Sequence, residues 1–285
     1  MENEEKYLQN VESLVPFPQI ALEVLDIAYS KECNFKELSR KIEQDQNLVA
    51  NMLRMANSAY FGHMKKITSI LDIIVRLGLE NVKMIAISSA SLGILKTPQE
   101  AYHMEPGDLW RHTFATATLA AIIGKYAHYQ ECTALYTAGL LHDVGKVVLN
   151  GPLLSEIFNH PDRVVDDMDI IDYERSFLQT DHAKVGMVLL QHWNLPGEIT
   201  IPVGFHHACE QAETNQIETK IVALANILTR CVDFHASGED VYVQQMREYV
   251  NSDAKLPKVD HFYDNMDDIF KEFHGKVNDP ERLFF

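Results

Sequence analysis

The sequence predicts an all-α protein built of two helical lobes. Apolar residues recur at three- and four-residue intervals through most of the 285-residue chain, whereas the alternating pattern of a β-strand is scarce. A stretch rich in proline, glycine and charged residues, from 96 to 108, interrupts this helical pattern. We therefore expect a first lobe over residues 1–100 and a second lobe over residues 101–285.

Capping signals divide the first lobe into helices. Asn34 can cap one helix, with Glu37 three residues further on. Thr68 can open another, and Gly78 is placed to end it. The expected helices of this lobe cover residues 20–28, 34–42, 48–55, 68–77 and 81–95.

The second lobe continues the helical pattern. An acidic run at residues 159–172 is expected to be a solvated loop rather than an ion site, and Thr180 can cap the helix that follows. Pro196 and Pro202 are expected to interrupt the chain before a pair of histidines. The expected helices of this lobe cover residues 109–127, 132–142, 180–193, 217–233, 240–251 and 261–274.

The chain is strongly acidic, with 25 lysines and arginines, 41 aspartates and glutamates and a formal net charge of −16. Nucleic acids and anionic membranes select a basic face, so we expect neither as a partner. The four cysteines form no Cys-x-x-Cys pair, which suits a reducing compartment. Because the sequence shows no signal-peptide pattern and no apolar run near ~20 residues, we expect a cytoplasmic protein.

The most informative local feature is the adjacent pair His142 and Asp143, at the end of a helix of small and apolar residues. Imidazole nitrogen and carboxylate oxygen are both ligands for first-row metals. A carboxylate at the end of such a helix faces the interior, where it is expensive unless it is neutralised. The sequence therefore predicts a partner for Asp143, and histidines elsewhere in the second lobe are the candidates.

Three histidines, His112, His142 and His182, fall on the apolar faces of three different expected helices. A single inward histidine is more often a hydrogen-bonded core residue than a metal ligand. Three of them on separate helices, with the adjacent pair His206 and His207, favour a shared metal site. A helical scaffold with a histidine core and no metal remains the alternative.

Neighbouring ligands on a helix diverge by about 100°, so they reach two ions, or one ion where the backbone turns. Gly145 places such a turn just after Asp143, whose carboxylate is therefore the natural centre of a dinuclear site. Mixed histidine and carboxylate ligands favour Fe, Mn, Zn, Co or Ni over Ca or Mg. Lys146 fits a phosphate-bearing ligand as a point charge, with a solvated surface lysine as the alternative.

The histidines and Asp143 resemble the ligands of the HD superfamily of metal-dependent phosphohydrolases, and the string His-Asp-Val-Gly-Lys at 142–146 resembles its HD-GYP branch. The first lobe is similar to HDOD domains, the HD-related output domains of bacterial signalling. Residues 14–18 (Leu-Val-Pro-Phe-Pro), 45–60 and 70–78 match three of their motifs in order, with Ile74 where alanine-isoleucine is usual. The resemblance covers residues 12–235 and implies a two-lobe HDOD architecture with an HD-type bundle in the second lobe.

The resemblance implies one or two divalent transition-metal ions, with Fe or Mn expected before Zn, Ni or Co. If the protein is an enzyme, Asp143 and Lys146 are its expected catalytic residues. The implied metal ligands are His112, His142, Asp143, His182, His206, His207 and, as a weak ligand, Asn226.

Two departures from the HD-GYP pattern bear on activity. Asn226 stands where the superfamily closes its metal site with aspartate, and an amide is a weaker, neutral ligand. Asp233 lies on the same face but about 10 Å further along the helix, at 1.5 Å per residue, so it does not substitute. Residues 208–212 carry no Gly-Tyr-Pro motif, so cyclic-dinucleotide phosphodiesterase activity is not expected.

Two functions compete on this sequence. HDOD proteins are regarded as signalling outputs that act through protein contacts, and we expect this bacterial regulatory role first, with a retained metal site and a protein partner. A metal-dependent phosphohydrolase acting on a phosphodiester or phosphomonoester is the alternative. The turn at residues 57–62 is expected to be structural rather than a binding loop.

Overall fold

The computed structural model describes residues 2–8, 20, 23–24, 27, 34–61, 66–163, 168–232, 241–252 and 256–277. Within these ranges the regular structure is helical, and strand pairing is limited to one isolated bridge between Gln99 and Met104. The predicted all-α class is confirmed. The motif at residues 14–18 and Asp233 lie outside the described residues, as does most of the helix predicted at 20–28.

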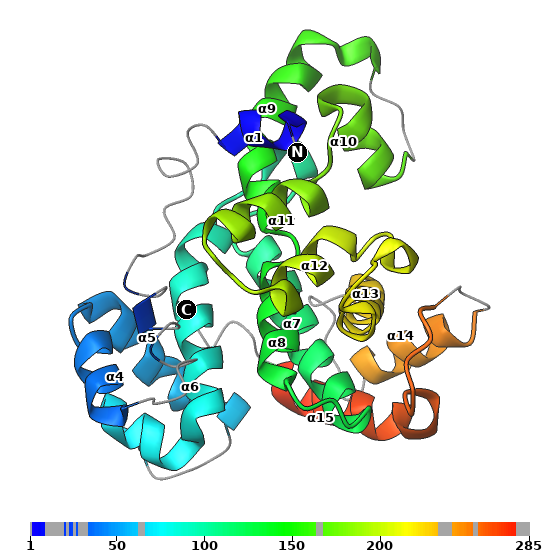
Figure 1. Ribbon diagram of the computed structural model, residues 1–285. Coiled ribbons are helices and arrows are strands. Elements are labelled where there is room, and N and C mark those ends of the chain that lie inside the picture. Colours follow the sequence, from blue (N-terminus) through cyan, green and yellow to red (C-terminus); the bar gives the residue numbers. More distant parts are fainter. Residues whose placement is uncertain are drawn as a thin grey trace.

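The described residues of the amino-terminal part form three main helices and a short segment that packs elsewhere (Figure 1). Asn34 caps the first of them as predicted, because its side chain accepts hydrogen bonds from the next backbone amides. Gly78 breaks the third helix with a φ of 78°, close to where the sequence places a helix end. The helices are α4 (Phe35–Ile42), α5 (Gln46–Ala56) and α6 (Ile70–Leu95), and the short segment is α1 (Glu2–Leu8).

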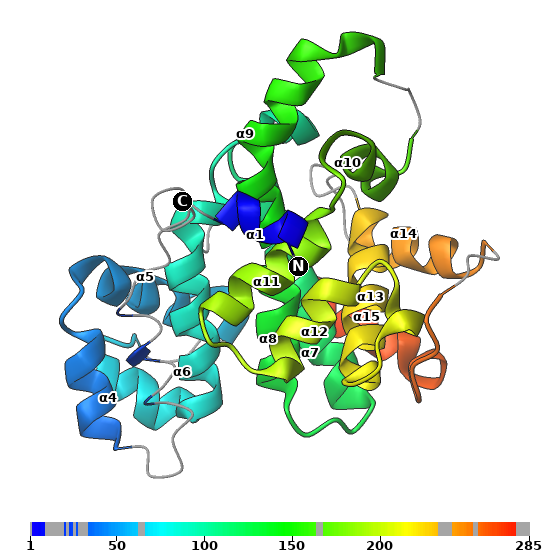
Figure 2. The same ribbon diagram turned by 45° about the horizontal axis from the view of Figure 1, so that its top comes forward.

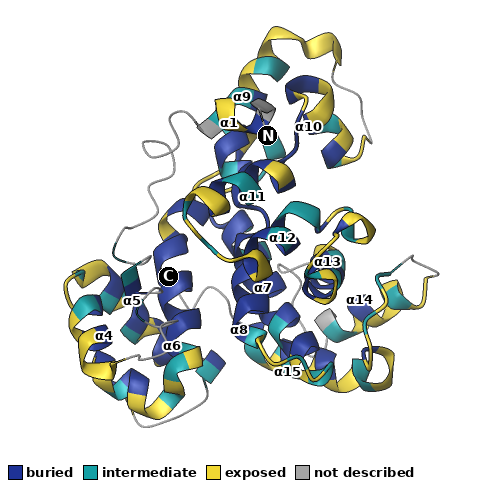
Figure 3. Cartoon of the chain, in the orientation of Figure 1, coloured by how far each residue is buried: buried dark blue, intermediate teal, exposed yellow. Residues whose placement is uncertain are grey.

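The carboxy-terminal part is a bundle around α7 and α8, most of whose residues are buried (Figure 3). Gly139 allows these two helices to touch, since a Cβ there would lie 2.8 Å from Ala117 Cα. The helices are α7 (Asp108–Tyr126), α8 (Cys132–Leu141), α9 (Val144–Asn159), α10 (Ile170–Leu178), α11 (His182–His192), α12 (Gly197–Phe205), α13 (Gln216–Arg230), α14 (Val241–Val250) and α15 (Met266–Val277).

The two parts meet at the break that the sequence predicts. Residues 96–107 contain only a short 3-10 helix, Glu100–Tyr102, between α6 and α7. Contacts nevertheless cross this break, because α6 packs on α8 and α15 packs on α7 and on the turn at Tyr60. The division into independent lobes at residue 100 therefore stays a prediction.

Three local predictions were wrong, and a fourth held in part. In the acidic run, the described residues between α9 and α10 are exposed and contain only a 3-10 turn, Pro161–Arg163, but α10 begins within the run, at Ile170, with Asp169 as its cap. Ser69, rather than Thr68, caps α6. Pro202 does not interrupt the chain but lies inside α12. Asp181, rather than Thr180, caps α11. The long helix α9 was not expected at all, although it carries the residues that follow Asp143.

In the described part of the turn after α5, Asn57 makes hydrogen bonds that agree with the predicted structural role. The Asn57 side chain donates to the carbonyl oxygens of Leu53 and Ile67, at 2.7 and 2.8 Å, and accepts from the Ile67 backbone N–H at 2.8 Å. The amide thus ties the end of α5 to the chain that returns toward α6.

Candidate metal centre

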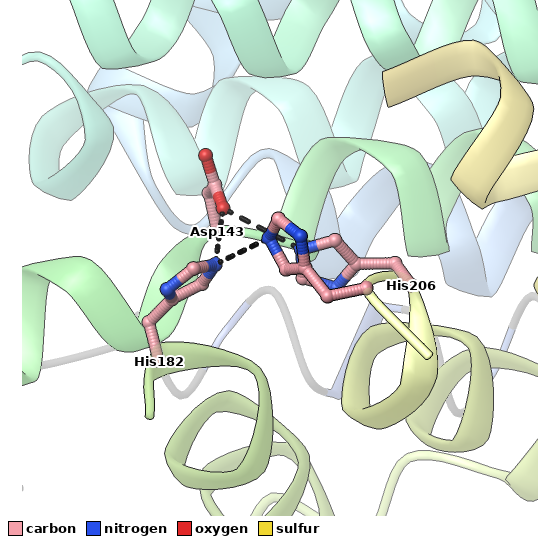
Figure 4. Close-up of side chains that lie close together, drawn as sticks. Asp143, His182 and His206 are labelled. Atoms are coloured by element: carbon pink, nitrogen blue, oxygen red, sulfur yellow. Dashed lines mark hydrogen bonds and ion pairs between the residues drawn. The ribbon is translucent and has the colours of Figure 1, made fainter. Parts of the chain in front are cut away.

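The predicted ligands converge at the ends of several helices in the carboxy-terminal bundle. Asp143 occupies the turn between α8 and α9, where it is 1% exposed, and His182 is the first residue of α11. Figure 4 shows Asp143, His182 and His206 facing one another. The remaining candidates are His112 on α7, His142 at the end of α8, His207 after α12 and Asn226 on α13.

Two groups of ligand atoms share Asp143. Each group lies within 4.8 Å, a spacing at which its atoms could bind one ion. In the first, Asp143 Oδ1 lies 3.0 Å from His182 Nε2 and 3.8 Å from His206 Nε2. His207 Nε2 completes this group at 3.2 Å from His182 Nε2.

The second group surrounds the other carboxylate oxygen. Asp143 Oδ2 lies 3.4 Å from His142 Nε2 and 3.6 Å from His112 Nε2. Asn226 Oδ1 is 3.1 Å from His112 Nε2, so the amide adjoins the group as the sequence suggests. If each group held an ion, Asp143 would contribute one carboxylate oxygen to each of them.

Backbone carbonyls orient the rings on both sides. His142 Nδ1 donates to the Gly139 carbonyl and His206 Nδ1 donates to the Val203 carbonyl, each at 2.7 Å. A hydrogen bond at Nδ1 fixes the tautomer and directs Nε2 toward the carboxylate. The rings are therefore held in position by the helices that carry them.

Glu174 belongs to the candidate site, although the sequence did not reveal it. This fully buried carboxylate accepts from His182 Nδ1 at 2.8 Å and from the His182 backbone N–H at 2.7 Å. Tyr102 OH also donates to it, at 2.7 Å. Carboxylates in this position orient a metal-binding histidine and raise its basicity. In the sequence Glu174 looks like one more acid beside an acidic run, and only the fold brings it to His182.

Lys146 is buried, so the solvated-lysine alternative is wrong. Its ammonium group donates to Asp143 Oδ2 at 2.6 Å. This places a positive charge on the carboxylate oxygen that faces His112 and His142. A cation bound to that oxygen would compete with Lys146.

Burial and neighbouring charges set the protonation states. Burial alone would raise the pKa of Asp143, but the charges of His142 and Lys146 hold it well below its usual range. Burial and nearby imidazoles lower the pKa of His112 to about 3 and that of His207 to about 2. Burial would also lower the pKa of His182, but Glu174 and Asp143 raise it to about 9.

The donor set fits a transition-metal ion. His206 Nε2 is buried and has no hydrogen-bond partner, although its ring is turned toward Asp143. Buried polar atoms are rarely left unpaired, and an ion held by this ring of ligands would pair with the Nε2 atom. The neutral imidazoles that follow from the lowered pKa values of His112, His206 and His207, and the ionised carboxylate, are the forms that bind metal, whereas His182 would have to release its proton to an ion.

Two glycines bring the ligand-bearing helices together. A Cβ at Gly145 would lie 2.0 Å from the His182 carbonyl oxygen, so only glycine permits α9 to approach α11 here. A Cβ at Gly186 would lie 3.2 Å from Val203 Cγ1 and 3.4 Å from the Gly145 nitrogen. The distance between Asp143 and His182 thus depends on these two positions.

Fold and site together define a helical protein whose bundle holds a cluster of histidines around one aspartate. A family model for the HDOD domain matches residues 14–209, more than half of the chain. The chain belongs to the HDOD family.

Solved structures share this fold. An HDOD domain protein of unknown function from Geobacter sulfurreducens is 23% identical, with a TM-score of 0.72 and 96% of each chain covered. A protein from Shewanella amazonensis SB2B, provisionally named a phosphohydrolase, is 24% identical, with a TM-score of 0.76 and 97% of each chain covered. At these identities the similarity establishes the fold alone.

A curated relative also matches. An uncharacterized protein of Treponema pallidum (strain Nichols) is 26% identical over 245 residues, which make up 85% of this chain and 46% of the relative. The chain thus spans just under half the length of this relative. Among the described helices, none has both the length and the apolar character needed to span a membrane.

We predict that Gly145→Ala opens the contact between α9 and α11. The added methyl group overlaps the His182 backbone, so the free energy of unfolding should fall by about 1–3 kcal/mol and metal retention should fall with it. Denaturant unfolding and elemental analysis measure the two effects. Gly151→Ala is the matched control on the same helix, because a Cβ there meets nothing within 4 Å. Equal effects of the two changes would contradict this account of the packing.

We predict that Glu174→Gln weakens metal binding by about 10–100-fold, because the amide still accepts a hydrogen bond from His182 but supplies no negative charge. Titration against a competing chelator measures the affinity. Asp172→Asn removes an exposed charge from the same helix and should leave it unchanged. A loss of thermal stability without a change in affinity would assign Glu174 a purely structural role.

Proposed function

We propose that this chain is a bacterial HDOD signalling module that acts through contact with a protein partner and retains an HD-type metal site. The proposal is supported above all by the unpaired, buried Nε2 atom of His206 within a ring of other ligands. A bound ion would give this atom the partner that the described hydrogen bonds do not supply. The signalling role is in keeping with a 20% identical relative of the same fold, a protein from Marinobacter aquaeolei VT8 provisionally named for signal transduction, with a TM-score of 0.70.

The two ligand groups would not bind ions equally. Asp143, His182, His206 and His207 offer three imidazoles and a carboxylate, so this group would hold the more tightly bound ion. The second group offers His112, His142 and the other oxygen of Asp143, which Lys146 already neutralises. Asn226 adds only a neutral amide. We expect Fe or Mn first, and Zn, Ni or Co as substitutes.

Phosphohydrolase activity is the second candidate, favoured by the carboxylate that both groups share. Two bound ions would supply positive charge to phosphate oxygens and Lewis acidity toward water. Lys146, beside the shared carboxylate, is within reach of an anionic ligand there. Asn226 and the absence of a Gly-Tyr-Pro motif at residues 208–212 place this activity second to regulation.

We predict about one tightly held transition-metal ion per chain when the protein is purified without a histidine tag or chelator. Asp143→Ala removes the carboxylate that both groups share, so it should abolish retention. Elemental mass spectrometry measures the content, and His160→Ala, an exposed histidine outside the cluster, is the control.

The same preparation separates the two candidate functions. A regulatory module should hydrolyse bis(4-nitrophenyl) phosphate no faster than the Asp143→Ala variant does. Two ions per chain with hydrolysis that Asp143→Ala abolishes would replace the regulatory proposal with the enzymatic one. No metal after anaerobic reconstitution would overturn the metal site itself.

We predict that Asn226→Asp increases the affinity for a second ion by about tenfold or more, because a carboxylate replaces the amide 3.1 Å from His112 Nε2. Titration with Mn, after the first site is filled, measures this affinity. Asn251→Asp adds the same charge at an exposed position after α14 and should have no effect. An unchanged second-site affinity would show that residue 226 does not face the ion.

A further inference from the structure

The carboxyl end of α9 exposes two apolar side chains one helical turn apart. Phe158 is 86% exposed, the largest value among the big apolar side chains of the described residues, and Leu154 is 38% exposed. Residues four apart lie on one face of a helix, so the two side chains form a single apolar patch. Burying a phenylalanine side chain contributes ~1.5–3 kcal/mol of favourable free energy, so a partner that covered this patch would be bound more tightly.

The patch lies on a part of the fold that projects. In Figures 1 and 2 the far end of α9, with α10 beside it, extends beyond the rest of the bundle. Figure 3 shows this end largely in the colour of exposed residues. Packing among the described residues therefore leaves Phe158 and Leu154 accessible to another molecule.

Acidic residues border the patch. Among its described residues, the segment at 159–172 that directly follows Phe158 holds three aspartates and one arginine, Arg163, a net charge of −2. Asp162, Asp169 and Asp172 are exposed in the structure. An apolar centre with an acidic border is complementary to an apolar segment flanked by lysine or arginine.

We infer that the Phe158–Leu154 patch is the docking surface for a protein partner that presents an apolar segment flanked by basic residues. The inference rests on the proposed role in signalling by protein contact, and it identifies the surface at which the partner would bind. A second copy of the chain does not fit, because a two-fold contact would place the acidic borders against each other. The same charge disfavours nucleic acid and anionic membranes.

The docking surface is joined to the metal centre by the helices that form it. α9 starts directly after Asp143 and carries Lys146 in its first turn, and α10 carries Glu174. A partner bound at the far end of these helices thus contacts the elements that hold the bridging carboxylate and orient His182. If the partner binds differently to the metal-loaded and metal-free forms, metal affinity changes by the same factor.

The test is site-specific photo-crosslinking of the full chain in the cells it comes from. A photoreactive phenylalanine analogue replaces Phe158 in one sample. In the control it replaces Val75, an apolar residue on α6 that is 73% exposed. We expect a crosslinked protein at position 158 that is absent at position 75, with the crosslink mapping to an apolar segment flanked by basic residues.

Binding of that purified partner then gives the size of the effect. Phe158→Ser and Leu154→Ser should each weaken binding at least tenfold, whereas Val75→Ser should change it less than twofold. The inference is overturned if no crosslink exceeds the control, if the crosslinked protein is a second copy, if the mapped segment is acidic, or if the three variants bind equally.

A metal-site variant separates this inference from the proposed metal site. His207→Ala alters the most accessible ligand and is expected to leave the fold intact. A crosslink at position 158 in the otherwise wild-type protein supports the docking surface. This result counts whether the protein contains metal or not. Loss of metal in His207→Ala together with an intact crosslink shows that the two sites stand independently.

Discussion

The structure of the carboxy-terminal bundle depends on the burial of one carboxylate. Asp143 is 1% exposed, and an ionised group in such a place is costly unless opposite charges or ligands compensate it. The compensation comes from rings on separate helices and from Lys146. Those rings reach Asp143 only because carbonyls fix their tautomers and because Gly145 allows two helices to touch. Packing, hydrogen bonding and electrostatics of the bundle thus converge on the same atoms.

The two oxygens of Asp143 have different surroundings, and this difference bears on function. Oδ1 faces His182 and His206. Oδ2 is paired with Lys146, and the ligand group beside it is completed by an amide rather than by a carboxylate. A dinuclear enzyme needs both halves to bind strongly, whereas a structural or sensing ion needs only one. The asymmetry therefore favours a regulatory role, and it puts Lys146 in a position to exchange with an ion.

The sequence predicted the parts of this arrangement that leave local signals. Asn34 and Gly78 mark helix ends through backbone chemistry that depends on single residues, and His112 and His182 fall on apolar stripes. It did not predict Glu174, because a buried acid and a surface acid look alike until tertiary contacts place one of them against His182. The helix through Pro202 was missed for a similar reason, since burial of α12 in the bundle outweighs the lost backbone hydrogen bond.

Anomalous diffraction from crystals grown with Mn would test the central claim most directly, because it locates an ion without assuming a function. The account predicts a peak in bonding contact with Asp143 and with the Nε2 atoms of His182, His206 and His207, and a weaker peak or none beside Asn226. A peak elsewhere, or an Asp143 carboxylate that binds no ion at saturating Mn, would contradict it.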